Sequence, residues 1–107
     1  MGDALKYKRV LLKISGEGLS GGGIGLEPAE INAVCGQISA LAKAGLQVAL
    51  VCGAGNIVRG ATLSSKATIG RVTADQMVML ATVINSLALT DVLTGMGSPA
   101  VCLSAVE

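Results

Sequence analysis

The sequence predicts an α/β fold built on a parallel sheet. Two aliphatic runs, 9–14 and 47–52, alternate with two segments of helical periodicity, 28–44 and 74–93. Strands that alternate with helices favour strand–helix–strand units with right-handed crossovers, and such units make parallel sheets. The composition supports a packed core, because 51% of the 107 residues are hydrophobic and only 14% are charged.

The first three elements follow in order. RVLLKI (9–14) is a near-continuous apolar run, typical of a strand that is covered on both faces. The glycine-rich loop SGEGLSGGGIG then leads to Pro28, which suits the first turn of a helix. The apolar face of that helix repeats at helical spacing: Ile31, Val34, Cys35, Ile38, Leu41 and Ala42. Gly45 predicts its end, and QVALVC (47–52) predicts the second strand.

A second helix is predicted from about Ala74 to Leu93. Thr73 and Gln76 form a capping-box pattern at its start. Apolar residues lie on nearly all its sides, so one face can pack on a sheet and the rest needs a second cover, such as another subunit. After the GMGSP turn, AVCLSAV (100–106) predicts a third strand.

Composition and charge exclude several classes of function. The net charge is +1 and the chain has one Tyr and no Phe or Trp, so it lacks the basic surface and stacking rings of a nucleic-acid-binding protein. The longest apolar stretch (77–93) is interrupted by Asn85, Ser86 and Asp91, which favours a helix of a soluble protein over a membrane span. Three cysteines without CxxC spacing and no histidine predict reduced thiols in a cytoplasmic protein and no metal site.

Two segments are expected to face one pocket. Lys13–Gly16 ends the first strand and Gly53–Asn56 ends the second, and parallel sheets bind ligands beyond the carboxyl ends of their strands. Glycine-rich turns let backbone N–H groups approach anionic oxygens. Lys13 interrupts an apolar strand at this end, so an anionic partner would compensate a buried ammonium; a solvated lysine is the alternative.

The second glycine loop matches neither of two familiar phosphate motifs. Val58 stands where a dinucleotide fingerprint requires its third glycine. Ala61 and Thr62 follow Gly60 where a Walker loop requires Lys and Ser or Thr. Phosphate binding therefore rests on the two loops together with Lys13.

Two further charged residues are candidates for binding. Arg59 can give phosphate a forked, permanently charged contact, although a surface salt bridge explains it equally well. Asp75 is expected in the first turn of its helix, where the helix dipole stabilises a carboxylate. It is either part of the helix start or an acceptor for ribose hydroxyls.

Three segments together resemble a known family. YKRVLLKISGEGLS, GAGNIVRG and RVTADQMVMLATVINSLALTDVL are similar, in order and spacing, to signatures of bacterial-type uridylate (UMP) kinases of the amino-acid-kinase superfamily. The resemblance implies a three-layer αβα sandwich with a mainly parallel sheet, of which residues 1–107 form the N-terminal βαβαβ part. It also implies transfer of the γ-phosphoryl group of ATP, with Mg²⁺, to UMP in pyrimidine biosynthesis.

Site residues carry over from the resemblance by position. The catalytic positions are Lys13 and Arg59. The ATP-binding positions are Lys13, Ile14, Ser15, Gly16, Gly55 and Arg59. The UMP-binding positions are Gly53, Ala54 and Asp75. An allosteric GTP loop corresponds to Gly21, Gly22, Gly23, Ile24 and Gly25. The helix 74–93 corresponds to a dimer-forming helix in a family that assembles as hexamers.

This sequence also departs from the family. The loop is commonly GGGN there and is GAGN here, so Ala54 would cost about 1 kcal/mol if it required a positive φ. Thr90 stands where some relatives carry an Arg linked to GTP, which argues against GTP activation. The family's later segments would lie beyond Glu107, so we expect little or no activity from this chain alone. The alternatives are a non-catalytic scaffold domain and an acylphosphate-forming relative such as acetylglutamate kinase.

Overall fold

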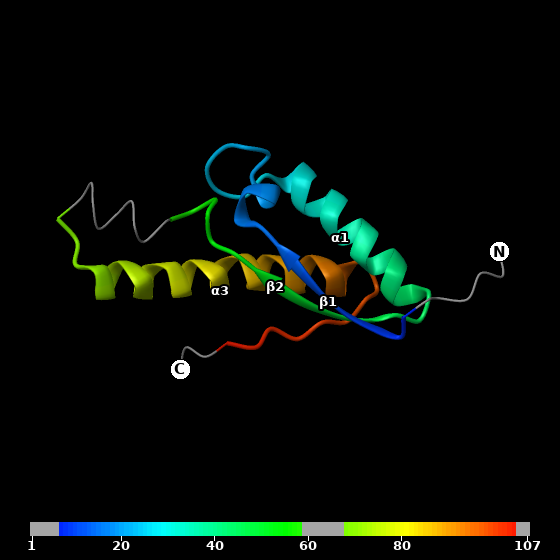
Figure 1. Ribbon diagram of the computed structural model, residues 1–107. Helices are drawn as coiled ribbons and strands as arrows, with labels where there is room; N and C mark the ends of the chain where they lie inside the picture. Colours follow the sequence, from blue (N-terminus) through cyan, green and yellow to red (C-terminus); the bar gives the residue numbers. More distant parts are fainter. Residues whose placement is uncertain (1–6, 59–67, 105–107) are drawn as a thin grey trace.

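The computed structural model describes residues 7–58 and 68–104, and Figure 1 shows their arrangement. The elements, in chain order, are strand β1 (Arg9–Ile14), the short 3-10 helix η1 (Gly16–Leu19), helix α1 (Pro28–Lys43), strand β2 (Gln47–Cys52) and helix α3 (Arg71–Gly95). The bounds of both strands and of α1 agree with the prediction to within a residue.

The two strands form a parallel pair, as the sequence predicted. Arg9 lies opposite Gln47 and Ile14 opposite Cys52, so the strands start and end together. Helix α1 makes the crossover between them, with Pro28 in its first turn (Figure 1). Beyond its end, Gly45 has a φ of +104°, a left-handed conformation that glycine adopts readily and other residues rarely do.

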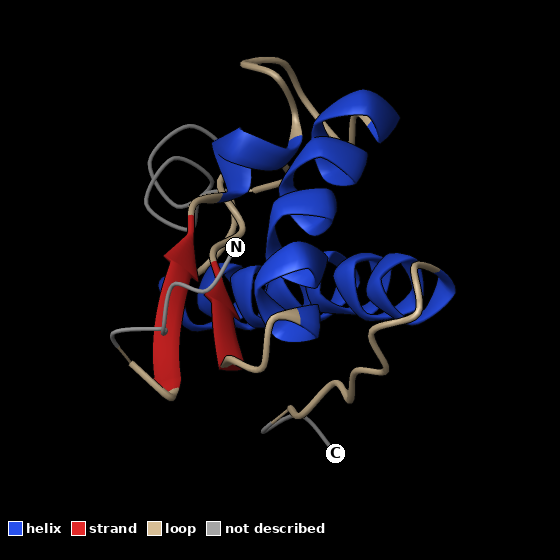
Figure 2. Ribbon diagram, turned by 90° about the vertical axis from the view of Figure 1, so that its right-hand side faces the viewer, coloured by secondary structure: helices blue, strands red, loops and turns tan. Residues whose placement is uncertain are grey.

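Both helices pack on the same face of the sheet (Figure 2). The core holds Leu19, Ile31, Cys35, Ile38, Leu89 and Leu93, with Leu12, Ile14, Val48, Leu50 and Cys52 packed against them. Every second strand residue points the other way and is exposed, including Leu11 at 64% and Val51 at 51%. The expectation that β1 is covered on both faces is therefore wrong for the described residues, in which only one helical layer covers the sheet.

Helix α3 begins earlier than predicted. It starts at Arg71 instead of near Ala74, with Gly70 at the N-cap and no side chain bonded to the cap. The Ala74 N–H donates to the Gly70 carbonyl oxygen at 2.9 Å, so the first turn is already closed before the proposed capping box could act. Thr73 lies inside the helix, where it cannot serve as a cap.

One stripe of α3 is buried and the rest is exposed. The buried residues are Ala74, Ala81, Asn85, Leu89 and Leu93. The large exposed apolar residues are Val72, Met77, Met79, Leu80, Ile84 and Leu87. By length and composition alone α3 could cross a membrane, with 22% of its most apolar window buried. The buried stripe packs against α1 and β2, so this side of the helix contributes to the core.

The third strand is absent from the described residues. The segment 100–104 has no regular structure, and residues 105 and 106 lie outside the described part. The Ala100 N–H donates to Thr94 Oγ1 at 3.3 Å instead of to a strand. A cleft of about 610 Å³ lies between this segment, α3 and the edge of β2. The prediction failed because an apolar run becomes a strand only where a neighbour receives its backbone hydrogen bonds.

Leu89 offers a test of the core. Leu89→Ala is expected to lower the free energy of unfolding by about 2–5 kcal/mol, because the leucine is 3% exposed and its loss leaves a cavity. Leu87→Ala is the matched control on the same helix; since Leu87 is 56% exposed, we expect a change within about 0.5 kcal/mol. Urea unfolding followed by circular dichroism measures both, and equal losses would contradict the packing described.

Candidate functional site

The two loops at the carboxyl ends of β1 and β2 meet at Gly16. The Gly53 N–H donates to the Ile14 carbonyl oxygen at 2.9 Å, which joins the loops at their base. A methyl group on Gly16 would lie 2.5 Å from Asn56 Oδ1 and 2.6 Å from the Gly55 nitrogen. Only glycine fits there, because a real Cβ atom does not approach other atoms so closely. The structure therefore brings together the two segments that the sequence placed around one pocket.

Three backbone N–H groups gather at this contact. Within residues 7–58 and 68–104, the N–H groups of Gly16, Gly55 and Asn56 donate to no protein acceptor. The Gly55 and Asn56 nitrogens lie 2.6 and 2.9 Å from the Cβ position of Gly16. Buried N–H groups are nearly always paired, and a cluster of free ones is suited to binding an anion.

A buried pair of asparagines supports the second loop. Asn56 is 2% exposed and Asn85, from α3, is fully buried. Asn85 Nδ2 donates to the Gly53 carbonyl oxygen at 2.7 Å and to Asn56 Oδ1 at 2.8 Å. The loop is thus fixed to the helix by side-chain hydrogen bonds as well as to β1 by its backbone.

Ala54 fits the loop without strain. No residue other than glycine has a positive φ in the described part of the chain, so the penalty considered for this alanine does not arise. Ala54 is buried, with 5% of the residue exposed.

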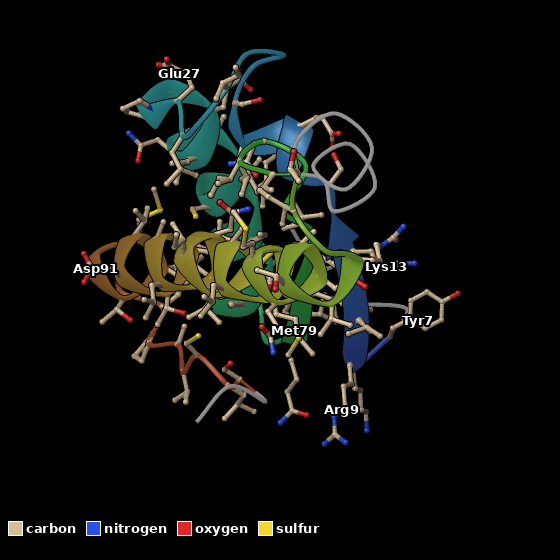
Figure 3. The ribbon with its side chains drawn as sticks, turned by 90° about the vertical axis from the view of Figure 1, so that its left-hand side faces the viewer. Tyr7, Arg9, Lys13, Glu27, Met79 and Asp91 are labelled. Carbon is tan, nitrogen blue, oxygen red and sulfur yellow. The ribbon has the colours of Figure 1, made fainter. Side chains whose placement is uncertain are left out.

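Lys13 lies at the end of β1 on the open face of the sheet. Its side chain is exposed and, with that of Arg9, projects from β1 into solvent (Figure 3). The solvated lysine, which the sequence left as an alternative, is the arrangement observed. Ile14 points the other way, into the core, and Ser15 caps η1 by accepting the Gly18 N–H at 3.3 Å. Of these residues, Lys13 has the side chain free to reach a ligand.

The structure does not bring Asp75 to the loops. Its carboxylate forms an exposed ion pair with Arg71, with Nε and Oδ1 2.9 Å apart. Because α3 begins at Arg71, Asp75 lies in the second turn, and the expectation that it lies in the first turn is wrong. Arg59 lies outside the described residues.

The proposed GTP loop contacts the same turn. Gly21, Gly22 and Gly25 have positive φ values of 65°, 90° and 88°. The Gly25 N–H donates to the Asn56 carbonyl oxygen at 2.8 Å, and the Gly25 carbonyl oxygen accepts Asn56 Nδ2 at 2.9 Å. Ile24, at the loop's tip, is 95% exposed.

The remaining candidate groups for metal or thiol chemistry are the acidic side chains and the three cysteines. No group of three or more His, Cys, Asp or Glu side chains that could hold a metal occurs in the described ranges. All three cysteines are free thiols, and burial raises the pKa of Cys35.

Comparison with known proteins assigns the family. The model of the amino acid kinase family matches residues 8–107. The chain belongs to this family. It is 48% identical over 104 residues to the uridylate kinase of Xanthomonas axonopodis pv. citri and 48% identical over 103 residues to that of Legionella pneumophila strain Corby. These matches include 96% and 95% of this chain but 43% and 42% of the relatives, so the chain spans less than half of their length.

Solved structures agree with this assignment. UMP kinase from Bacillus anthracis superposes with a TM-score of 0.74 and 39% identity, over 83% of this chain and 36% of that one. UMP kinase from Ureaplasma parvum gives a TM-score of 0.72 and 34% identity, over 84% and 39%. The chain therefore has the N-terminal part of the amino-acid-kinase αβα fold, of which the described residues form the sheet and one helical layer.

Sequence reasoning missed the roles of Asn56 and Asn85. From its pattern alone, the sequence presents Asn56 only as the end of a glycine loop and Asn85 only as an interruption of an apolar stretch. One pattern could have identified Asn85: it occupies a position between Ala81 and Leu89, four residues from each, on the buried stripe of α3. An amide at such a position requires a buried partner.

The contact at Gly16 can be tested by adding one methyl group. Gly16→Ala is expected to lower the free energy of unfolding by about 1–3 kcal/mol, because the methyl group meets backbone atoms that cannot move aside cheaply. Gly18→Ala, two residues away, is the control: its methyl group would approach only Ser15 Oγ, at 3.6 Å, so we expect no loss of stability. Urea unfolding compares the two variants, and a Gly16→Ala protein as stable as Gly18→Ala would disprove the close contact.

Proposed function

We propose that this chain carries the phosphate-binding part of a UMP kinase, which transfers the γ-phosphoryl group of ATP to UMP. The observation that carries the proposal is the contact of two glycine-rich loops at Gly16, in a chain 48% identical to uridylate kinases over almost all its length. Phosphoryl transfer depends chiefly on positioning and on neutralising charge, for which N–H groups and cations are suited.

The proposed site residues divide into contacts for two nucleotides. The N–H groups of Gly16 and Gly55 would donate hydrogen bonds to phosphate oxygens of ATP, and Lys13 would neutralise charge on the transferring group. The segment Lys13–Gly16 would thus serve ATP, with Arg59 as a further cation. Gly53, Ala54 and Asp75 would serve UMP, for which Asp75 must exchange its ion pair with Arg71 for the ligand.

Mg²⁺ is the cofactor that this reaction implies. The described residues do not form a site for it, because the loops present N–H donors and an ammonium group, which suit phosphate oxygens and not a cation. We therefore propose that Mg²⁺ arrives bound to ATP, and we assign no step of the reaction to residues of this chain acting through it.

Assembly and location belong to the same proposal. The exposed apolar residues of α3 support a homo-oligomer that forms through this helix. Met79, labelled in Figure 3, is one of them and is 46% exposed. We propose hexamers built from such dimers, in the cytoplasm, acting in pyrimidine biosynthesis. The glycine loop 21–25 is the candidate site for an effector nucleotide.

Substitution of Lys13 tests the proposed ATP site. In a titration of the ¹⁵N-labelled chain with ATP and Mg²⁺, we expect shifts concentrated in the amides of residues 13–16 and 53–56. Lys13→Ala should weaken this binding about tenfold or more, because an ammonium beside phosphate forms a charge-assisted contact. Lys8→Ala is the control, since Lys8 is also exposed but precedes the start of β1. Equal weakening of ATP binding by both substitutions would contradict the assignment of Lys13 to the ATP site.

An acceptor panel tests the reaction itself. Coupled ADP release from ATP and Mg²⁺ is measured with this chain and UMP, CMP or N-acetylglutamate. We expect turnover to require UMP and to be slow, because the chain spans 43% of the length of its relatives. Release that requires N-acetylglutamate would instead identify an acylphosphate-forming kinase. No ADP release with any acceptor, together with dimers that nucleotides do not stabilise, would identify a non-catalytic scaffold domain.

A further inference from the structure

Asn56 and Asn85 form a closed ring of two hydrogen bonds. Asn56 Nδ2 donates to Asn85 Oδ1 at 3.1 Å, and Asn85 Nδ2 donates to Asn56 Oδ1 at 2.8 Å. The residues are 29 positions apart in the sequence, and both are almost completely buried. This ring joins the turn after β2 to the middle of α3.

All four side-chain N–H groups of the ring are used. The second N–H of Asn56 reaches the Gly25 carbonyl oxygen at 2.9 Å, and the second N–H of Asn85 reaches the Gly53 carbonyl oxygen at 2.7 Å. Turning either amide over would set its oxygen against a carbonyl oxygen, so the ring has one orientation. A buried network in which every donor is satisfied holds its members in one arrangement.

The ring also reaches the glycine loop 21–25. Gly25 is bound twice by Asn56, through its N–H to the backbone oxygen and through its carbonyl to the side chain. Asn85 itself has no bond to Gly25, so any effect of Asn85 on this loop must pass through Asn56. On its other side, Asn56 lies directly against Gly16.

We propose that Asn85 is a positioning residue, which acts through Asn56 to lock the turn 53–56 and the loop 21–25 into one unit against Gly16. A change in either loop is then transmitted to the other. The value of this unit for phosphoryl transfer rests on the proposed function, because only then do the amides of Gly16 and Gly55 face phosphate. The mechanical connection does not depend on it.

Amide exchange measures this connection without any nucleotide. In Asn85→Ala, the Gly25 N–H should exchange about tenfold faster or more, since Asn56 loses the partner that orients it. The Cys35 N–H, in the core of α1, reports general loss of stability and should accelerate less. Ser86→Ala is the matched control: the Ser86 hydroxyl bonds Cys52 Sγ at 3.0 Å from the same helix and makes no hydrogen bond to either loop, so Gly25 should be unaffected.

Two results would overturn the proposal. One is a Gly25 exchange rate that does not change in Asn85→Ala. The other is a rise at Gly25 no larger than the rise at Cys35, which would mean that Asn85 only supports the core.

The unsubstituted chain gives a second measurement, which is valid even if the variant does not fold. The side-chain N–H groups of Asn56 and Asn85 should exchange about tenfold more slowly than those of Asn32, which is exposed on α1. Equal rates would show that the ring does not form in solution. Neither measurement involves turnover, so the ring can fail while UMP kinase activity holds, and the activity can fail while the ring holds.

Discussion

The close approach of backbone to backbone at Gly16 is the constraint on which the rest of the site depends. Two parallel strands of equal length bring their carboxyl ends to the same level, and a residue without a side chain lets the following loops touch. That contact places within one small region three N–H groups that have no acceptor among the described residues. The buried asparagines then hold the second loop at the required distance. Without the glycine, the asparagines could not hold this loop so close to β1.

The sequence predicted what depends on local periodicity and failed where distant groups decide. The two strands and α1 follow from apolar spacing, Pro28 and Gly45, and they were predicted correctly. The capping pattern at Thr73 misplaced the start of α3, because Gly70 closes the first turn earlier. The run 100–106 has the composition of a strand. Within the described residues, however, no neighbouring strand pairs with its part 100–104.

The candidate site also has features that the local sequence predicts and features that depend on residues far apart in the chain. Convergence of the two glycine loops could be predicted, since it follows from strand direction alone. The partnership of Asn56 with Asn85 could not, because it joins residues 29 positions apart through the packing of α3. Nor could the exposure of Lys13, which depends on whether a second layer covers the sheet. Its side chain points away from both helices, on the face that carries Leu11 and Val51.

That open face has an electrostatic consequence. The Lys13 side chain is exposed to solvent, and the high dielectric constant of water weakens its attraction to an anion several-fold relative to a partly buried site. A layer that covered Leu11 and Val51 would exclude water beside Lys13 as well, because Val51 lies directly opposite Lys13 in the register. The same cover that completed the hydrophobic packing would therefore strengthen the attraction of Lys13 for an anion, and the bound anion would in turn compensate the loss of water around the ammonium.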